Sequence, residues 1–257
     1  MMKPLWMLSQ TELAHLAVAR CADCAGTGIA DDGEPCACCD TFETAVARAN
    51  FPPRWETATL ADVQWEAIQP ANVRTGLQTY ADDLERYLAA NLGLFLSGPV
   101  GCGKTHLAIG IGKLACALGY TVHVVSVPAW FQALRDSYAE TRPPHERALM
   151  QPLQETDLLI LDDLGAERAS DWGRERLYVV VNQRSVQQLP TLVTTNESLA
   201  DLEAALGPRT LSRLCGDALV FALAGDDYRQ IQKRERLARL HATPTHRVME
   251  DANGLSV

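Results

Sequence analysis

The sequence has few of the features that mark membrane, secreted or broadly nucleic-acid-binding proteins. No apolar run among its 257 residues approaches the roughly 18 that a membrane helix needs. The first ten residues lack a basic stretch followed by a long apolar one, so we expect no secretory leader and a cytoplasmic location. The sequence has 23 Lys and Arg against 32 Asp and Glu, and the net charge of −9 disfavours tight, non-specific binding of nucleic acid by the whole surface. This charge leaves room only for DNA held in a local basic channel, such as one formed in an oligomer.

Internal repeats and long low-complexity stretches are absent as well, and the composition is that of a globular protein with one or two domains. The acidic residues gather at one end, because residues 1–70 carry ten Asp and Glu against four Lys and Arg. We therefore expect the N-terminal part to contact a protein and not a phosphate backbone. Five of the eight cysteines fall within residues 21–39, and in a cytosolic chain such a cluster favours a metal site over disulfides.

The cysteine cluster has the spacing of a structural zinc site. Cys21, Cys24, Cys36 and Cys39 form the pattern C-x₂-C-x₁₁-C-x₂-C, in which each pair can supply two thiolates to one tetrahedral ion. We predict Zn²⁺ at these four residues, with Cys38 left over, although Cys36 and Cys38 are alternatives as the spare thiol. An iron–sulfur cluster and a redox dithiol are the alternative interpretations of the same spacing.

Beyond about residue 79 the sequence alternates between helical and strand patterns, which predicts an α/β fold with a parallel sheet. Strands are expected over 92–97, 121–127, 157–161, 191–194 and 218–223, and helices over 80–91, 104–118, 128–140, 145–154, 172–188 and 226–240. Two further helices are expected over 11–20 and 40–49, before a proline-containing break at 51–55.

Residues 98–105 read GPVGCGKT and fit the phosphate-binding pattern G-x-x-x-x-G-K-[ST] between a predicted strand and a predicted helix. Glycines allow backbone N–H groups to surround phosphates, and the helix N-terminus adds its positive end. We expect Lys104 to reach the β- and γ-phosphates of ATP and the Thr105 hydroxyl to bind Mg²⁺. The predicted nucleotide-binding residues are Gly98, Pro99, Val100, Gly101, Cys102, Gly103, Lys104, Thr105 and His106.

An apolar strand pattern ends in two acids, Asp162 and Asp163, which should lie at the carboxyl edge of the sheet beside the phosphates. We predict that Asp162 holds Mg²⁺ and that Asp163 orients the attacking water. Paired acids of this kind fit an enzyme that hydrolyses ATP better than a passive binder. A solvated acidic turn is the alternative.

Several further motifs follow in order, at 164–168, 172–178, 181–184, 194–196, 206–214 and 225–229. With the segment 51–55 they make residues 51–240 resemble AAA+ replicative helicase loaders of the DnaC type and the related IstB-type transposition ATPases. The resemblance implies an AAA+ P-loop core whose parallel sheet is flanked by helices. We accordingly expect a small zinc-binding, partner-binding domain over 1–50, an AAA+ ATPase domain over 51–240 and a flexible tail over 241–257.

The same resemblance assigns roles to polar residues after the acidic motif. Asn196 matches sensor 1, which positions the lytic water, and Arg229 matches sensor 2. Arg213 matches the arginine finger donated to the ATP of a neighbouring subunit, and Arg209 lies one helical turn earlier and could share this role. A finger donated in this way requires self-association through AAA+ interfaces.

The family also implies partners. Helicase loaders bind a hexameric replicative helicase and single-stranded DNA, and Tyr138, Arg174 and Arg176 lie where DNA contacts fall in the family. Some loaders carry an N-terminal zinc domain that docks on the helicase, and the arrangement here is similar. One alternative is an IstB-type transposition helper that acts with a transposase on duplex DNA. Another is an adaptor with slow ATP turnover, because Asp163 is one methylene shorter than the Glu usual in AAA+ proteins.

Overall fold

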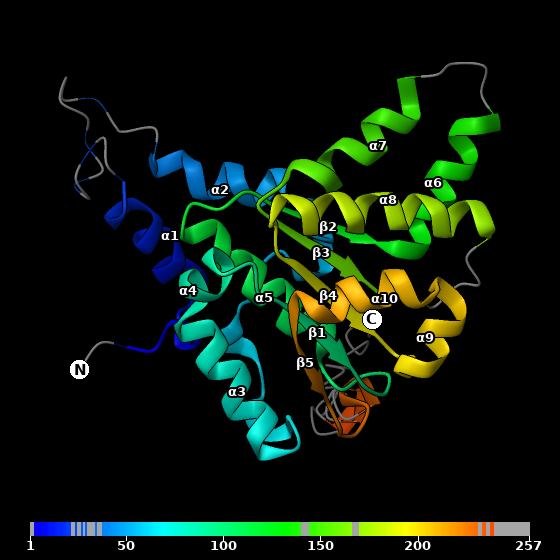
Figure 1. Cartoon of the computed structure of the whole chain (residues 1–257). Coiled ribbons are helices and arrows are strands. Elements are labelled where there is room, and N and C mark those ends of the chain that lie inside the picture. The colour runs from blue at the N-terminus through cyan, green and yellow to red at the C-terminus, as the bar shows by residue number, and fades with distance from the viewer. Residues whose placement is uncertain are drawn as a thin grey trace, which may run out of the picture.

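The computed structural model describes residues 3–21, 24, 27, 29, 34, 38–139, 144–165, 170–230, 233–234 and 237–238 (Figure 1). At residues 38–41, 138–139 and 144–145 this description covers the backbone alone. Along these ranges, none of the helices has the length and apolar character needed to cross a bilayer. The predicted tail over 241–257 lies outside the described residues, as do 231–232, 235–236 and 239–240 of the predicted helix over 226–240.

A five-stranded parallel sheet forms the centre of the molecule, which confirms the predicted α/β fold. Its strands lie in the order β2-β3-β4-β1-β5. They comprise β1 (Gly93–Ser97), β2 (Val122–Ser126), β3 (Leu158–Asp162), β4 (Thr191–Thr195) and β5 (Ala218–Ala222). Because all pairings are parallel, the loops that follow β1, β3 and β4 emerge at one edge of the sheet, with β4 in the middle.

Successive side chains of each strand point to opposite faces, and both faces are covered by helices. Leu94 and Leu96 pack into the cluster formed by α5 (Lys104–Ala117), α1 (Gln10–Ala19) and α2 (Cys38–Arg48). Phe95 packs into the cluster on the other face. The helices there are α6 (Val127–Ala139), α7 (Pro144–Glu155), α8 (Asp171–Gln187), α9 (Leu199–Leu206) and α10 (Pro208–Gly216).

The segment between α2 and β1 contains more helix than the sequence analysis predicted. It includes α3 (Ala71–Asp82) and α4 (Leu84–Ala89), and three short 3₁₀ helices at Pro53–Trp55, Leu60–Asp62 and Trp65–Ala67. A further 3₁₀ helix lies at Leu5–Met7. The prediction of a helix over 80–91 found only the end of α3 together with α4.

The described N-terminal helices lie directly on the sheet domain. The backbone N–H of Val124 on the edge strand β2 donates to the Ala49 carbonyl at 2.8 Å, and the Asn50 amide donates to the Val124 carbonyl at 3.2 Å. On α5, the buried Lys113 ammonium donates to the carbonyls of Trp55 (2.8 Å) and Glu56. These bonds hold the residues after α2 against α5 and β2, which positions the wall of the site described next.

Candidate nucleotide-binding site

The phosphate-loop motif forms a tight turn between β1 and α5. Gly98, Gly101 and Gly103 have φ values of +150°, +82° and +97°, which favour glycine. At Gly98 a Cβ would lie 2.4 Å from the Leu223 carbonyl oxygen, so no larger residue fits there. The turn leads into the N-terminus of α5, where unpaired N–H groups and the helix dipole attract anions.

The Lys104 ammonium lies inside this turn. The residue is 5% exposed, and Nζ donates to the carbonyls of Gly98 (2.8 Å) and Pro99 (2.7 Å) and lies 3.7 Å from the Cys102 Sγ. Phosphate oxygens could replace these carbonyl acceptors while the Lys104 ammonium stays within the loop. The position of Lys104 therefore suits the neutralisation of a bound phosphate.

The two residues predicted to bind Mg²⁺ lie within hydrogen-bond distance of each other. The Thr105 hydroxyl donates to Asp162 Oδ1 at 3.0 Å, and the Thr194 hydroxyl at the end of β4 donates to the same oxygen at 2.7 Å. Burial, reinforced by the neighbouring Asp163, raises the pKa of Asp162, while the two hydroxyls and Lys104 oppose that rise. A hydroxyl and a carboxylate are oxygen ligands of the kind that Mg²⁺ prefers, so this pair fits the ion.

Asp163 begins the turn after β3 in a left-handed conformation, with φ +56°. Its backbone N–H donates to the Thr194 hydroxyl at 3.0 Å, and the next N–H, from Leu164, donates to the Thr194 carbonyl at 2.9 Å. Both bonds tie the turn to β4. Asp162 and Asp163 consequently have different surroundings, and only Asp163 lines the cavity beside the phosphate loop.

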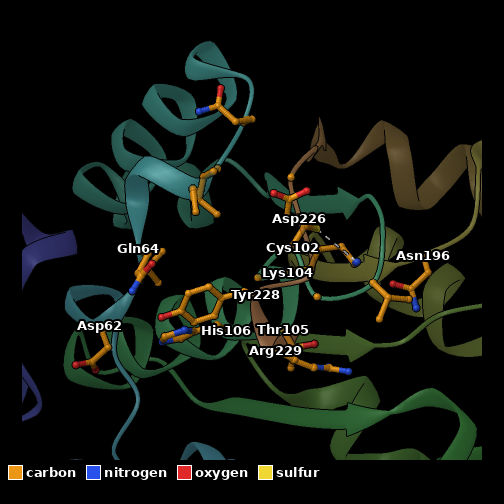
Figure 2. A pocket seen from close by; sticks show the side chains of 18 of the residues that line it. Asp62, Gln64, Cys102, Lys104, Thr105, His106, Asn196, Asp226, Tyr228 and Arg229 are labelled. Atoms are coloured by element: carbon orange, nitrogen blue, oxygen red, sulfur yellow. Dashed lines mark hydrogen bonds between the residues drawn. The ribbon is translucent and has the colours of Figure 1, made fainter. Parts of the chain in front are cut away.

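A cavity of about 620 Å³ opens in front of the loop (Figure 2). Asn196, which follows β4, and Arg229, from the C-terminal segment, both line it. Gly98, Pro99 and Asp162 do not line it, but they contact Lys104 and Thr105, which do. The predicted residues among the cavity lining are Val100, Gly101, Cys102, Gly103, Lys104, Thr105, His106, Asp163, Asn196 and Arg229.

The opposite wall comes from the segment before α3 and was missed by the sequence analysis. Trp55, Gln64 and Ile68 line the cavity there. His106 joins the two walls, because its ring lies 5.1 Å from that of Trp55 and its Nε2 lies 3.0 Å from the Thr59 carbonyl oxygen. Burial lowers the pKa of His106. The segment 51–70 has no regular apolar period, and only the motif at 51–55 marked it out.

The C-terminal segment also closes against the phosphate loop. The Tyr228 N–H donates to the Gly101 carbonyl at 3.1 Å, and the Arg229 N–H donates to Asp227 Oδ1 at 3.0 Å. A Cβ at Gly101 would lie 1.9 Å from that Asp227 oxygen. This packing brings Tyr228 and Arg229 to the cavity, with Asp226 near Cys102 and Lys104 in Figure 2. The sequence analysis included both aspartates in the motif at 225–229 but assigned a role only to Arg229.

Arg213 and Arg209 lie on α10, away from the site. Neither is among the described residues that line the cavity. The Arg213 guanidinium lies 5.4 Å from the centre of the Tyr178 ring, and its Nη1 donates to the Arg209 carbonyl at 3.3 Å. Arg213 is thus not part of the nucleotide cavity of its own chain, as an arginine donated to a neighbour requires.

The two predicted DNA-contacting arginines form ion pairs on α8. Arg174 contacts Asp171 at 3.0 Å, and Arg176 contacts Glu146 of α7 at 2.8 Å. The Arg176 guanidinium also lies 5.6 Å from the Trp172 ring. Tyr138 belongs to α6, but its side chain lies outside the described residues.

The predicted zinc site lies largely outside the described part of the chain. Cys21 is half-buried and Cys24 is buried, and both pack beside Val18 at the end of α1. Cys36 and the side chain of Cys39 are not among the described residues. Where side chains are described, no group of three or more His, Cys, Asp or Glu is placed to hold a metal ion. Zinc binding therefore stays a prediction.

Four features together define a P-loop nucleotide-binding protein of the AAA+ class. They are the sheet order, the phosphate loop after β1, the acids at the end of β3 and the polar residue after β4. The sequence pattern of the family described as IstB-like ATP binding protein matches residues 41–238, and the chain belongs to this family. It is accordingly an AAA+ ATPase, as the sequence resemblance implied.

Relatives include replicative helicase loaders and an insertion-sequence protein. The chain is 25% identical over 183 residues to the replicative helicase loader DnaC of Escherichia coli (strain K12), which covers 71% of this chain and 73% of that protein. It is 31% identical over 147 residues to the insertion sequence IS5376 putative ATP-binding protein of Geobacillus stearothermophilus, covering 55% and 56% of the two chains.

Solved structures show the same fold. The crystal structure of DnaI matches with a TM-score of 0.57 and 26% identity, over 68% of this chain and 95% of that one. The crystal structure of the DnaC helicase loader matches with a TM-score of 0.58 and 23% identity, over 67% and 99% of the two chains.

Proposed function

We propose that this chain is an ATP-dependent loader that binds a replicative, DnaB-like hexameric helicase and single-stranded DNA in the cytoplasm, and places the helicase on DNA when replication begins. Its similarity over 183 residues to proteins described as replicative helicase loaders supports this proposal. The observation that carries its ATP-dependent step is the division of the catalytic set. One cavity contains Lys104, Asp163, Asn196 and Arg229, whereas Arg213 lies elsewhere on the surface.

In the proposed reaction, Lys104 and Arg229 neutralise the phosphates, and Thr105 and Asp162 would hold Mg²⁺, which would supply further charge neutralisation. Asp163 orients the attacking water and accepts its proton, and Asn196 donates a hydrogen bond that fixes the water near the γ-phosphate. As the water oxygen bonds to the γ-phosphorus, the bond from that phosphorus to the β,γ-bridging oxygen breaks, and ADP leaves. The arginine finger comes from Arg213 of a neighbouring subunit. The chain alone would therefore bind ATP but hydrolyse it slowly.

Mixing two inactive variants tests the donated finger. Asp163→Asn keeps Arg213 but lacks the water-orienting acid, and Arg213→Ala keeps the acid but lacks the finger. We expect each variant alone to have at least about a hundredfold lower ATPase rate than the native chain. A mixture of the two should recover activity at those interfaces where an intact finger meets an intact acid. A mixture no faster than the sum of its parts would contradict the assignment.

We also propose that the N-terminal part binds Zn²⁺ through Cys21, Cys24, Cys36 and Cys39 and docks on the helicase. The acidic character of this part supports a protein contact. We expect one zinc per chain by elemental analysis, and co-purification of the intact chain with the replicative helicase of the same cell. Cys21→Ser/Cys24→Ser should lose the zinc and the co-purification with the helicase. The control Cys215→Ser, on α10, should keep both properties. A double variant that binds the helicase as well as the intact chain does would rule out this role.

Single-stranded DNA is proposed to contact Tyr138 by stacking, and Arg174 and Arg176 through its phosphates. Binding requires these arginines to exchange Asp171 and Glu146 for phosphate oxygens. We expect Arg174→Ala/Arg176→Ala to weaken single-stranded DNA binding and to reduce its salt dependence. Arg86→Ala, an exposed arginine of α4 that lies far from α8 in Figure 1, is the matched control and should bind normally.

The alternative is a transposition helper that acts with a transposase on duplex DNA. The 31% identity to the insertion-sequence protein favours it. Steady-state ATPase measurements with each form of DNA separate the two functions, because the loader should respond to single strands and the helper to duplex. A turnover that stays slow with both forms would instead favour an ATP-gated adaptor.

A further inference from the structure

The surface position of Arg213 is set by contacts between α8 and α10. The face of the Tyr178 ring lies 5.4 Å from the guanidinium carbon, and the Arg209 carbonyl accepts a hydrogen bond from Nη1 at 3.3 Å. An arginine side chain has several rotatable bonds, so a free one would occupy many positions. The aromatic face and the carbonyl together restrict it to one region of the surface.

The helices that carry these residues are already fixed to each other by other contacts. Leu177 on α8 and Leu214 on α10 are both buried in the same apolar cluster. The Ser185 hydroxyl also donates to Asp217 Oδ2 at 2.7 Å, which joins the C-terminal ends of the two helices. Tyr178 is half-exposed and does not belong to that apolar cluster, so its contact with Arg213 is separate from the packing that docks α10 on α8.

We propose that Tyr178 is a positioning residue for the arginine finger. This inference rests on the proposed role of Arg213 in a neighbouring subunit. The cation–π contact confines the guanidinium to one region before the subunits meet, so that less conformational freedom is lost when it reaches the neighbour's γ-phosphate. The aromatic face carries this role and the phenol hydroxyl does not.

A double-mutant cycle on the full-length chain tests the inference. We expect Tyr178→Leu, which keeps an apolar side chain but removes the aromatic face, to lower kcat about two- to fivefold with KM for ATP unchanged. Tyr178→Phe should retain the native kcat, as should Val179→Ala at an exposed neighbouring position of α8. In an Arg213→Ala background, Tyr178→Leu should have no further effect.

Placement of the substitution in the mixed assembly separates positioning from a general effect on folding. Tyr178→Leu in the Asp163→Asn chain, which donates the finger, should lower the recovered ATPase activity. The same substitution in the Arg213→Ala chain, which holds the working nucleotide site, should leave it unchanged. Equal losses from both placements, or no loss from either, would overturn the inference while leaving the donated finger intact. If instead Arg213→Ala has native kcat, the proposed finger itself is wrong, and the role of Tyr178 fails with it.

Discussion

At the scale of single residues, Gly101 shows how backbone conformation and packing combine at the phosphate loop. Its φ of +82° disfavours a side chain, and the Asp227 carboxylate occupies the space that a Cβ would need. Gly119 has a similar φ of +90°, but nothing lies within 4 Å of its Cβ position. The two glycines thus share a conformational requirement and differ in packing.

We expect Gly119→Ala to cost about 1 kcal/mol of unfolding free energy from conformation alone. Gly101→Ala should cost at least about 1 kcal/mol more, because the C-terminal segment must move, and it should also weaken ATP binding. Urea unfolding and titration calorimetry measure the two effects. If the two variants behave alike in both measurements, the packing of Asp227 against the loop has no energetic importance.

The residue scale also shows where sequence patterns were sufficient. The glycines, Lys104 and Thr105 were recognised because phosphate binding constrains consecutive residues, and the pair at 162–163 because a buried strand ends there. Asp227, Trp55 and Thr194 lie in motifs that the sequence analysis singled out, but it assigned them no role, because their contacts at the site are with residues far along the chain. Their contribution depends on tertiary packing, which no local spacing records.

At the scale of secondary-structure elements, Arg184 joins α8 to the loops that enter the sheet. It is 1% exposed and makes five hydrogen bonds, to the Thr191 hydroxyl and to backbone carbonyls. The carbonyls belong to Leu153, Thr156, Asp157 and Pro190. Burial lowers the pKa of Arg184 to about 9, yet the guanidinium stays charged at neutral pH.

Arg184→Lys keeps the charge but cannot reach all five acceptors from one nitrogen. We expect it to lower the free energy of unfolding by about 3 kcal/mol, because buried carbonyls lose their partners. Arg174→Lys, at the surface ion pair with Asp171, is the control and should change the free energy of unfolding by less than about 0.5 kcal/mol. Equal stabilities of the two variants in urea would show that the network around Arg184 is unimportant.

The strands, and the helices that follow β1, β2 and β3, were predicted to within a few residues, because apolar runs and helical periods are local signals. The short helices α9 and α10, which follow β4, were not predicted. The first three quarters of α3, residues 71–79, were missed. Its buried positions, Val73 and Leu77, are separated by polar and small residues, and the helix is stabilised by packing on the core beside Leu5–Met7 and the sheet domain. Packing of this kind overrides weak local preference.

At the scale of the whole molecule, the division of the site between subunits makes activity depend on assembly. The ATPase rate per chain should rise with chain concentration until the finger-donating interfaces are filled. Arg213→Ala should stay slow at every concentration. Turnover measured over a wide concentration range, together with the oligomeric state at each point, checks this. A native rate that is independent of concentration while the chain is monomeric would mean that the finger is not donated.

The central claim is that ATP binds in the cavity between the phosphate loop, the acids after β3 and the C-terminal segment. Titration calorimetry of ATP with Mg²⁺ against Lys104→Ala tests it most directly. Loss of a charged hydrogen-bond donor to phosphate should weaken binding by about 1.5–3 kcal/mol, which is roughly tenfold or more. Lys3→Ala, an exposed lysine paired with Glu12, should bind as the native chain does. Native affinity in Lys104→Ala would contradict the account.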